Sequence, residues 1–474
     1  MENSLTTRPF GAKDKVGYMF GNVANDLTFI FASMFLTVFY TDVLCINAGL
    51  VGTMFLLSRL VDAFTDTIMG RIADKVKAGK GGKFKPWLIR MCGPVALASF
   101  LMYQTGMANA SMGVRIAYMF ATYLLWGSVC YTAINIPYGS MASVMSNEAD
   151  DRAALSTFRG VGSLIPQVLV GVVMPMFLYT TLEDGETKVV NAPAFLWVAL
   201  ILAIASIGCY ILCYFMCTER VEITKKDEHK VTFKETVKAL FSNRALIGIV
   251  IVYICFLGAQ MLNQTINNYI FKDYFSDTMG LTVMNAAGFV PALALAPIAV
   301  PMTRKFGKKE LGIGAAILGG SAYTLLFILH TESMWFYVIL SILGSLGFGL
   351  FNLIIWAFVS DIIDDHEVRT GNREDGTVYA VCSFSRKLGQ AIASALGGWS
   401  LAWIGYVEGA TKQTAEVNSG IYNIATLVPA ILYIVVGLTL AFVYTLNKKK
   451  VLENVETLKA RRAEKTVETA TENA

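Results

Sequence analysis

Long apolar segments recur along the whole of this chain. A helix that crosses the hydrocarbon core of a bilayer needs about 20 predominantly apolar residues. Twelve segments fit that length, centred on residues 18–43, 48–73, 86–107, 113–141, 157–179, 192–217, 245–270, 282–302, 311–330, 334–362, 379–404 and 422–446. Only 16% of the residues are charged, whereas a soluble globular chain has about 25%. The sequence therefore predicts an all-α membrane protein with twelve transmembrane helices.

The loops between these segments differ in their content of lysine and arginine. Residues 75–85, 220–244 and 304–309 are rich in them, whereas residues 45–48 and 331–333 have none. Basic residues mark the cytoplasmic side of a membrane. We therefore expect a multi-pass protein of the bacterial inner membrane with both termini in the cytoplasm. The polar N-terminal stretch lacks the apolar core of a cleavable signal peptide.

The chain also divides into two similar halves. We expect a six-helix half over residues 1–217, a cytoplasmic linker over 218–244, a second six-helix half over 245–446 and a cytoplasmic tail over 447–474. The basic sequence GKFKPW after the second segment has a counterpart, RKFGKKEL, after the eighth. Two six-helix halves are typical of major-facilitator transporters, whose substrate site lies near the midplane. We expect the polar tail to form a short helix followed by disorder.

Two carboxylates lie within the second apolar segment. Asp62 and Asp66 are four residues apart, so on a helix they share one face, with Thr65 beside them. An ionised side chain at the bilayer centre costs about 2.5–3.5 kcal/mol. The pair is therefore a candidate ion or proton site that faces a polar cavity. The alternative is that Arg59 neutralises one carboxylate and the helix is merely held in a bundle.

Polar residues at helical spacing mark one face of five predicted helices. Such residues also join helices to one another, at about 0.6 kcal/mol each, but five polar faces drawn from both halves favour a hydrated central cavity. Amides, carboxylates and an indole face suit a ligand with many hydroxyl groups. The residues are Asn22, Asn25, Asp26, Thr132, Asn135, Gln260, Asn263, Gln264, Asn267, Asn352, Trp356, Ser360, Ser383, Lys387, Gln390 and Ser394.

Other classes of site receive little support from the sequence. The eight cysteines show no CxxC pair or Cys/His spacing of a metal site. No phosphate-binding glycine motif follows a strand. A membrane-embedded enzyme such as a glycosyltransferase would need a catalytic constellation or a large extramembrane segment, and neither is visible. We expect no enzyme activity, no cofactor and no nucleic-acid partner.

Several motifs resemble those of a known family. They are YTDVLCINAGLVGTMFLLSRLVDAFTDTIMGRIAD (40–74), GKFKPW (82–87), NIPYGS (135–140), SDIIDDHEVRTGNREDG (360–376) and SFSRKLGQAI (383–392). Together they resemble the glycoside–pentoside–hexuronide:cation symporters, the branch of the major facilitator superfamily that includes the melibiose and glucuronide carriers. The resemblance covers about residues 10 to 446. The segment NIPYGS is more similar to glucuronide-type carriers, because melibiose carriers have Asp at the position of Asn135.

The resemblance implies a role for individual residues. It implies a cation site at Asp62, Asp66 and Thr132, with Thr65 where melibiose carriers have Asn, so that Na⁺, H⁺ and Li⁺ all stay open. It implies sugar contacts at Asp26 and Arg159 and near Asn135, and a charge-balancing role for Lys387. A family tryptophan of helix four falls at Gly139, and one of helix ten falls at Asn352. With the polar faces, the candidate substrate residues are Asn25, Asp26, Asn135, Arg159, Gln264, Asn352, Trp356 and Lys387.

The sequence therefore predicts a symporter that uses a monovalent cation, Na⁺ or H⁺, to import a glycoside, pentoside or hexuronide by alternating access. Its partners would be the sugar, the cation and membrane lipid. An uncoupled sugar facilitator and a membrane sugar sensor that no longer transports are the alternatives.

Overall fold

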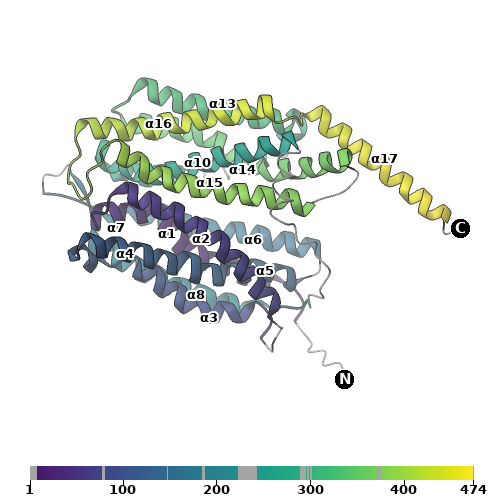
Figure 1. The fold of residues 1–474 in the computed structure, drawn as a ribbon, viewed down its shortest axis with the longest axis horizontal. Helices are drawn as coiled ribbons and strands as arrows, with labels where there is room; N and C mark the ends of the chain where they lie inside the picture. Colours follow the sequence, from purple (N-terminus) through teal and green to yellow (C-terminus); the bar gives the residue numbers. More distant parts are fainter. Residues whose placement is uncertain are drawn as a thin grey trace. The chain divides into compact units, whose positions relative to one another are not determined.

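The computed structural model describes residues 8–76, 79, 81–146, 148–183, 187–221, 243–288, 295, 298, 301–370 and 375–472 (Figure 1). Most of them form long helices, because each apolar segment can satisfy its backbone hydrogen bonds only within itself inside a bilayer. The α-helices are α1 (Ala12–Val38), α2 (Ala48–Lys75), α3 (Lys85–Leu101), α4 (Met112–Leu124), α5 (Thr132–Met145), α6 (Ala149–Val168), α7 (Pro175–Leu178), α8 (Ala192–Met216), α10 (Arg244–Tyr269), α11 (Thr278–Ala287), α13 (Lys308–Leu329), α14 (Met334–Thr370), α15 (Asp375–Trp403), α16 (Ala415–Leu438) and α17 (Lys448–Glu472).

Short π-helical turns interrupt or end five of the long helices. They shift the phase of the side chains that follow, and such turns occur often at functional sites. Within the described part of the chain they are η1 (Phe39–Val43), η3 (Leu125–Tyr131), η4 (Leu169–Val173), η5 (Ile270–Tyr274) and η6 (Thr439–Val443), beside one 3₁₀ turn, η2 (Thr105–Asn109). A two-stranded antiparallel hairpin, β1 (Tyr179–Thr181) with β2 (Lys188–Val190), is a small addition to the predicted all-α fold.

Ten helical spans in the described residues are long and apolar enough to cross a membrane. The other two predicted segments, 282–302 and 379–404, are not among these ten spans. About half of segment 282–302 lies outside the described residues. Segment 379–404 is helical as part of α15, which carries Arg386 and Gln390 among its apolar residues. The helical architecture is thus the predicted one.

The described chain forms two compact units. Unit 1 comprises Met1–Asp227, Gln264–Asn285 and Ser394–Ile421, and unit 2 comprises Glu228–Asn263, Ala286–Ala393 and Tyr422–Ala474. Unit 1 therefore includes two segments of the predicted second half. The predicted linker over 218–244 lies mostly outside the described residues, and the boundaries of the predicted halves stay predictions.

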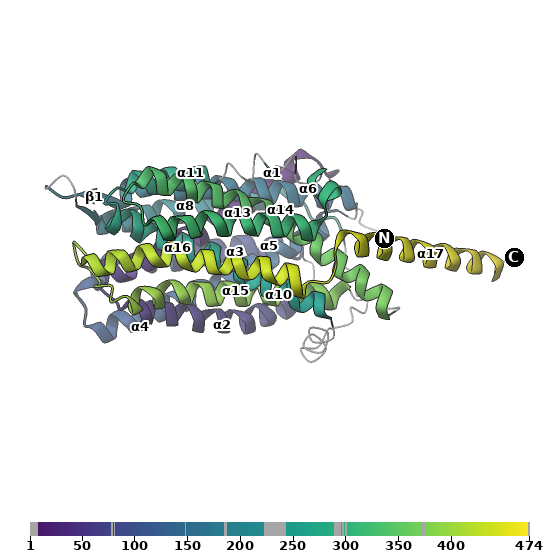
Figure 2. The same ribbon diagram turned by 90° about the horizontal axis from the view of Figure 1, so that it is seen from above.

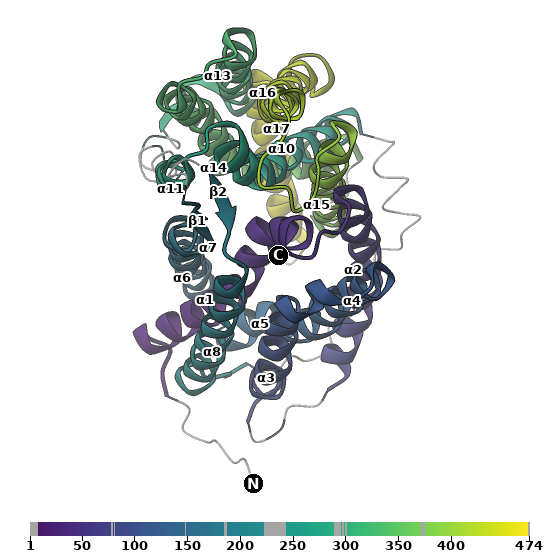
Figure 3. The same ribbon diagram turned by 90° about the vertical axis from the view of Figure 1, so that its left-hand side faces the viewer.

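In unit 1, α1 is the central helix. It packs against α8 and α6, while α3 packs against α8 and α5, and α2 against α5 (Figure 3). An aromatic cluster fills the space between α1, the end of α3 and α8: the ring of Phe31 lies 4.6 Å from that of Tyr103 and 6.1 Å from that of Phe195, centroid to centroid. Helix α2 is buried on one side only, since Phe64 is 72% and Ile68 is 55% exposed on the other.

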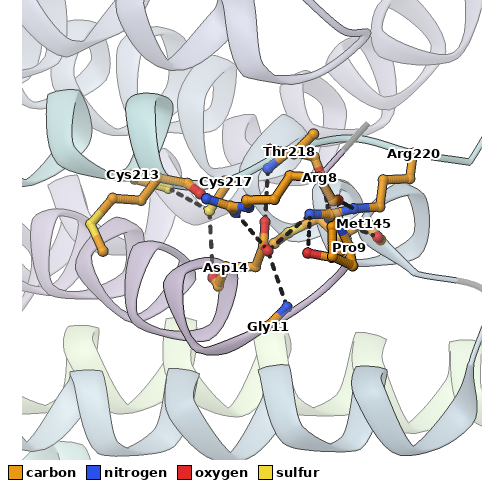
Figure 4. A network of polar contacts seen from close by, with 10 residues as sticks. Arg8, Pro9, Gly11, Asp14, Met145, Cys213, Cys217, Thr218 and Arg220 are labelled. Carbon is orange, nitrogen blue, oxygen red and sulfur yellow. Dashed lines mark hydrogen bonds and ion pairs between the residues drawn. The ribbon is translucent and has the colours of Figure 1, made fainter. Parts of the chain in front are cut away.

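A buried carboxylate fixes the start of α1 to the end of α8 (Figure 4). Asp14 is fully buried, and its carboxylate accepts hydrogen bonds from Arg8 (2.7 Å), Arg220 (2.9 Å) and the backbone N–H of Thr218 (3.0 Å). Two guanidinium groups around one carboxylate leave no unpaired negative charge in the interior. The contact therefore fastens segments more than 200 residues apart in the sequence.

We expect Asp14→Ala to destabilise the protein strongly, because removing one partner of a buried ion pair costs about 3–5 kcal/mol. The measurement is the apparent unfolding temperature of the purified protein in detergent. Lys13→Ala, an exposed neighbour on the same turn, is the control and should leave that temperature unchanged. Equal unfolding temperatures for the two variants would show that the Asp14 network does not stabilise the fold.

In unit 2, α13 packs along α14, and an aromatic core joins α14 to α10. The rings of Phe256 and Phe348 stack with centroids 4.5 Å apart. The last helix, α17, continues beyond the end of α16 (Figure 2). It is anchored to α14 by a hydrogen bond from the Asn454 amide to the Asp365 carboxylate (3.1 Å), with Asn454 itself buried.

The helix α17 corrects one prediction. It runs for 25 residues, to Glu472, so the expectation of a short helix followed by disorder is wrong for this stretch. The physical reason is its composition, which is rich in lysine and glutamate and includes alanine and arginine, all residues with high helix propensity. Its contact with α14 adds tertiary support to that local preference.

Candidate cation and sugar site

The two carboxylates of α2 face one neighbouring helix. The hydroxyl of Ser128 donates a hydrogen bond to Asp62 (2.5 Å), and that of Thr132 donates one to Asp66 (2.9 Å). Ser128 and Thr132 are four residues apart, as are the two aspartates. Each hydroxyl therefore faces one carboxylate on two successive helical turns. The turn η3 lies directly before Thr132, whose hydroxyl also reaches the carbonyl of Gly127 five residues earlier (3.2 Å).

The ion pair that the sequence offered as an alternative is present as well. The guanidinium of Arg59 donates to Asp62 with a distance of 3.2 Å between Nη1 and Oδ2. The guanidinium of Arg59 thus pairs with Asp62, whose side chain is 14% exposed and therefore partly shielded from water. A group of carboxylate and hydroxyl oxygens on neighbouring helices suits a single monovalent cation or a proton.

A second polar cluster lies between α1 and α6. The amide nitrogen of Asn22 donates to Asp26 (2.8 Å) and to the hydroxyl of Ser163 on α6 (2.7 Å), while its amide oxygen accepts from Arg159 Nε (3.1 Å). Asn22 therefore holds the carboxylate of Asp26 and the guanidinium of Arg159 next to each other by bonding to both. A carboxylate and a guanidinium held in this way can bind hydroxyl groups of a ligand, since the carboxylate can accept and the guanidinium can donate further hydrogen bonds.

Two aromatic residues connect the clusters. The rings of Phe29 and Tyr131 stack at 5.7 Å, and the Arg59 guanidinium lies 5.8 Å from the Phe29 centroid. Tyr131 lies near charged groups of both clusters, which are Asp26, Arg159, Arg59 and Asp66. One aromatic side chain therefore borders both clusters.

The remaining predicted site residues have varied positions. Asn25 is buried (1% exposed), and both ends of its amide are engaged, by the Tyr210 hydroxyl (2.9 Å) and the Gly21 carbonyl (3.1 Å). It packs α1 against α8 in this way, and its contact with sugar stays a prediction. The hydroxyl of Thr65 donates to the backbone carbonyl of Asp62 within its own helix (3.2 Å).

Other predicted residues stay predictions. Asn135 in α5 and Gln264 in α10 are partly buried residues of unit 1, and Asn352 is an exposed residue of α14 in unit 2. The side chains of Trp356 and Lys387 lie outside the described residues. Nothing places these three residues of unit 2 relative to the clusters of unit 1.

Three functional candidates were missed by sequence reasoning, namely Ser128, Ser163 and Tyr131. Ser128 had a signal, because it lies one helical turn before Thr132 and must share its face. Ser163 and Tyr131 had none, since serines and tyrosines are common in these segments. In the described residues, no group of three or more His, Cys, Asp or Glu side chains could hold a metal ion, so a cation at Asp62 and Asp66 would also need hydroxyl, carbonyl or water oxygens.

These helices and polar clusters define a membrane transporter of the major-facilitator type. Residues 17–448 match the model of the family described as MFS/sugar transport protein. The chain belongs to this family, within the branch of glycoside–pentoside–hexuronide:cation symporters. It is a multi-pass membrane transporter of sugars and not an enzyme.

Individual relatives agree with that placement. The chain is 31% identical to the "Uncharacterized symporter YjmB" of Bacillus subtilis, over 96% of each chain. It is 30% identical to the "Glucuronide carrier protein homolog" of Escherichia coli, over 93% of this chain and 94% of the relative. A solved D-xylose-proton symporter shares the fold, with a TM-score of 0.60 at 13% identity over 89% of this chain and 96% of that one.

Proposed function

We propose that this protein couples the entry of a monovalent cation to the import of a glycoside, pentoside or hexuronide. The observation that carries the proposal is the arrangement of Asp62 and Asp66, which share one face of α2 and accept hydroxyl hydrogen bonds from Ser128 and Thr132. A bound Na⁺ or proton would neutralise carboxylate charge at this site. Neutralisation would make closure around the sugar less costly, so sugar and cation would increase each other's affinity.

The sugar would bind at Asp26 and Arg159. They lie in the second cluster, which is connected to the first through Phe29 and Tyr131. The name of the Escherichia coli relative, a glucuronide carrier homolog, supports including sugar acids among the candidates, and Arg159 offers a cationic partner for a carboxylate. Alternating access would then carry both solutes across the membrane.

The setting of the protein follows from the same proposal. The apolar side chains that α2 and α8 expose, such as Phe64 and Phe215 (72% and 70% exposed), would contact lipid acyl chains. Given the distribution of basic residues, both termini would lie in the cytoplasm of a bacterial cell.

Uptake of a panel of labelled glucuronides, xylosides and galactosides tests the proposal. Membrane vesicles containing the protein would be compared with and without a Na⁺ gradient and with and without a proton gradient. We expect at least one sugar to accumulate above its external concentration only when one gradient is present. Equilibration without accumulation under every gradient would identify a facilitator, and sugar binding without any uptake would identify a sensor.

A further inference from the structure

Two aspartates and one lysine are buried together at one end of unit 1. The lysine Nζ of Lys272 pairs with the carboxylate of Asp42, and with that of Asp273 at 3.4 Å. The side chains of Asp42, Lys272 and Asp273 are 6%, 5% and 3% exposed. Asp42 follows Asp26 by sixteen residues on the same continuous helix, roughly 24 Å along its axis. The cluster is therefore separate from the cation and sugar residues described above.

A tyrosine hydroxyl lies at the centre of this cluster. The oxygen of Tyr406, in the turn after α15, is 3.0 Å from Lys272 Nζ, 3.0 Å from Asp42 Oδ1 and 3.3 Å from Asp273 Oδ2. A phenol has one hydrogen to donate and can accept two hydrogen bonds. It can thus accept from Lys272 and donate to only one of the two carboxylates.

The two aspartates occupy equivalent positions of an internal repeat. Each follows the start of a π-helical turn, η1 or η5, by three residues. The two turns end alike, since the N–H of Ile46 bonds to the carbonyl of Tyr40 and that of Asp277 to the carbonyl of Phe271, each at 2.9 Å. The residues three places after each aspartate, Cys45 and Ser276, both have φ of 51°.

The same repeat explains why the charges do not balance. The residue before Asp273 is Lys272, whereas the equivalent residue before Asp42 is Thr41, whose hydroxyl donates to Asp42 (2.9 Å) and lies 2.9 Å from the Tyr269 hydroxyl. The repeat thus brings two carboxylates together and supplies one ammonium. With all three groups ionised the cluster has a net charge of −1, and an unneutralised charge in a buried site is costly.

The hydrogen-bond geometry identifies where a proton would be held. Asp42 accepts from Lys272, Thr41 and Tyr406, as an ionised carboxylate does. If Tyr406 donates its one hydrogen to Asp42, the contact between Tyr406 and Asp273 can be a hydrogen bond only when Asp273 is the donor, so Asp273 must then carry a hydrogen. We propose that Asp273 binds a proton in this closed arrangement, donates it to Tyr406 in a hydrogen bond, and releases it to water when the cluster comes apart.

Other charged and titratable groups near the cluster do not replace this proton. Tyr179 of β1 interacts electrostatically with both aspartates, but a neutral phenol adds no positive charge. Arg115 of α4 is directed at backbone carbonyls, those of Ala110 (2.8 Å) and Leu44 (2.9 Å).

The nearby acid Glu408 is engaged elsewhere. Its carboxylate accepts from the Asn47 amide (3.0 Å) and the Ala48 N–H (2.8 Å) at the start of α2. Asp277 accepts from the N–H of Met279 at the start of α11 (2.8 Å). Neither is part of the Lys272 cluster.

The proton site has a consequence for the transport cycle. The cluster joins the end of α1 to η5 and to the turn at Tyr406, and these segments belong to the two predicted halves of the chain, so alternating access requires it to separate. The cluster binds one proton more when it is closed than when it has come apart. The closed state is therefore favoured at low pH and lost as pH rises. The ratio of closed to open molecules should fall by up to about tenfold per pH unit, which is the limit for one proton.

The test measures the distance between two spin labels by pulsed electron paramagnetic resonance. The labels are attached through the substitutions Met112→Cys and Glu416→Cys, at two exposed positions of unit 1. The full-length protein would have its eight native cysteines replaced. It would be studied from pH 5.5 to 8.5 without sugar or Na⁺, so that the result does not depend on the proposed coupling at Asp62 and Asp66. We expect the short-distance population to decrease as pH rises.

Three variants distinguish the proton site from other causes. Asp273→Asn removes the surplus charge and should keep the short distance at every pH, with less than a twofold change in the ratio. Lys272→Met adds a second unneutralised charge and should shift opening to lower pH. Asp277→Asn, the matched control on the same turn, should behave like the unaltered protein.

Several results would overturn the proposal. They are a pH-independent distance in the unaltered protein, or full pH dependence in folded Asp273→Asn. If Asp273→Asn does not elute as a folded monodisperse species, Asp42→Asn takes its place in the test, because it also removes one negative charge from the cluster. Retained pH dependence in folded Asp42→Asn would likewise exclude the shared proton.

Discussion

Asp66→Asn is expected to abolish concentrative uptake while the protein stays folded. The carboxylate of Asp66 accepts from the Thr132 hydroxyl (2.9 Å), and an asparagine oxygen can accept the same hydrogen bond. What the variant loses is the charge. Charged hydrogen-bond partners contribute about 1.5–3 kcal/mol, so cation affinity should fall by about 10- to 150-fold. Downhill exchange of sugar should survive in part, because the sugar is held by other helices.

The measurement is sugar binding to purified variants over a series of Na⁺ concentrations and over pH. Ser128→Ala is the graded control, since it removes a neutral donor to Asp62 and should weaken cation dependence by only about 3- to 10-fold. Asp62→Asn is the less clean probe, because it also deprives Arg59 of its partner. A folded Asp66→Asn protein that keeps full cation stimulation of sugar binding would show that this pair is not the coupling site.

The second large effect is expected at the sugar residues. Asp26→Ala or Arg159→Ala should weaken sugar binding by at least about 10-fold, because each removes a charged partner worth about 1.5–3 kcal/mol from a polar network. Isothermal titration or fluorescence competition with the sugar found in the uptake panel would measure this. Unfolding temperature, recorded in parallel, separates lost binding from lost folding.

Arg152→Ala is the matched control for Arg159→Ala. Arg152 is an exposed arginine on the same helix, α6, seven residues earlier. We expect its removal to leave sugar affinity unchanged. Unchanged affinity in both Asp26→Ala and Arg159→Ala would place the sugar elsewhere in the protein.

The sequence alone determined the elements of the fold and the shared helix face of Asp62 and Asp66. Apolar length predicts helices in a membrane because no water is present to satisfy the backbone, and the long helices lie where the apolar segments are. The four-residue spacing of Asp62 and Asp66 fixes a shared face without any knowledge of neighbours. Both indeed accept hydrogen bonds from one helix, through Ser128 and Thr132.

Only the tertiary structure decided which polar residues meet. The sequence could not tell Asn22, which joins Asp26 to Arg159, from Asn25, which packs α1 against α8, because both are polar residues on one helix. Their roles depend on the rotation of α1 against its neighbours, which is set by packing along the whole helix.

The spacing of apolar and polar residues in the sequence could not predict the π-helical turns either. A single added residue in η3 or η5 changes the direction of every following side chain relative to a regular α-helix. The Asp42–Lys272 pair, 230 residues apart, depends on such turns at the ends of two helices. No local pattern contains that contact, because it exists only once the two turns are brought together by the folded chain.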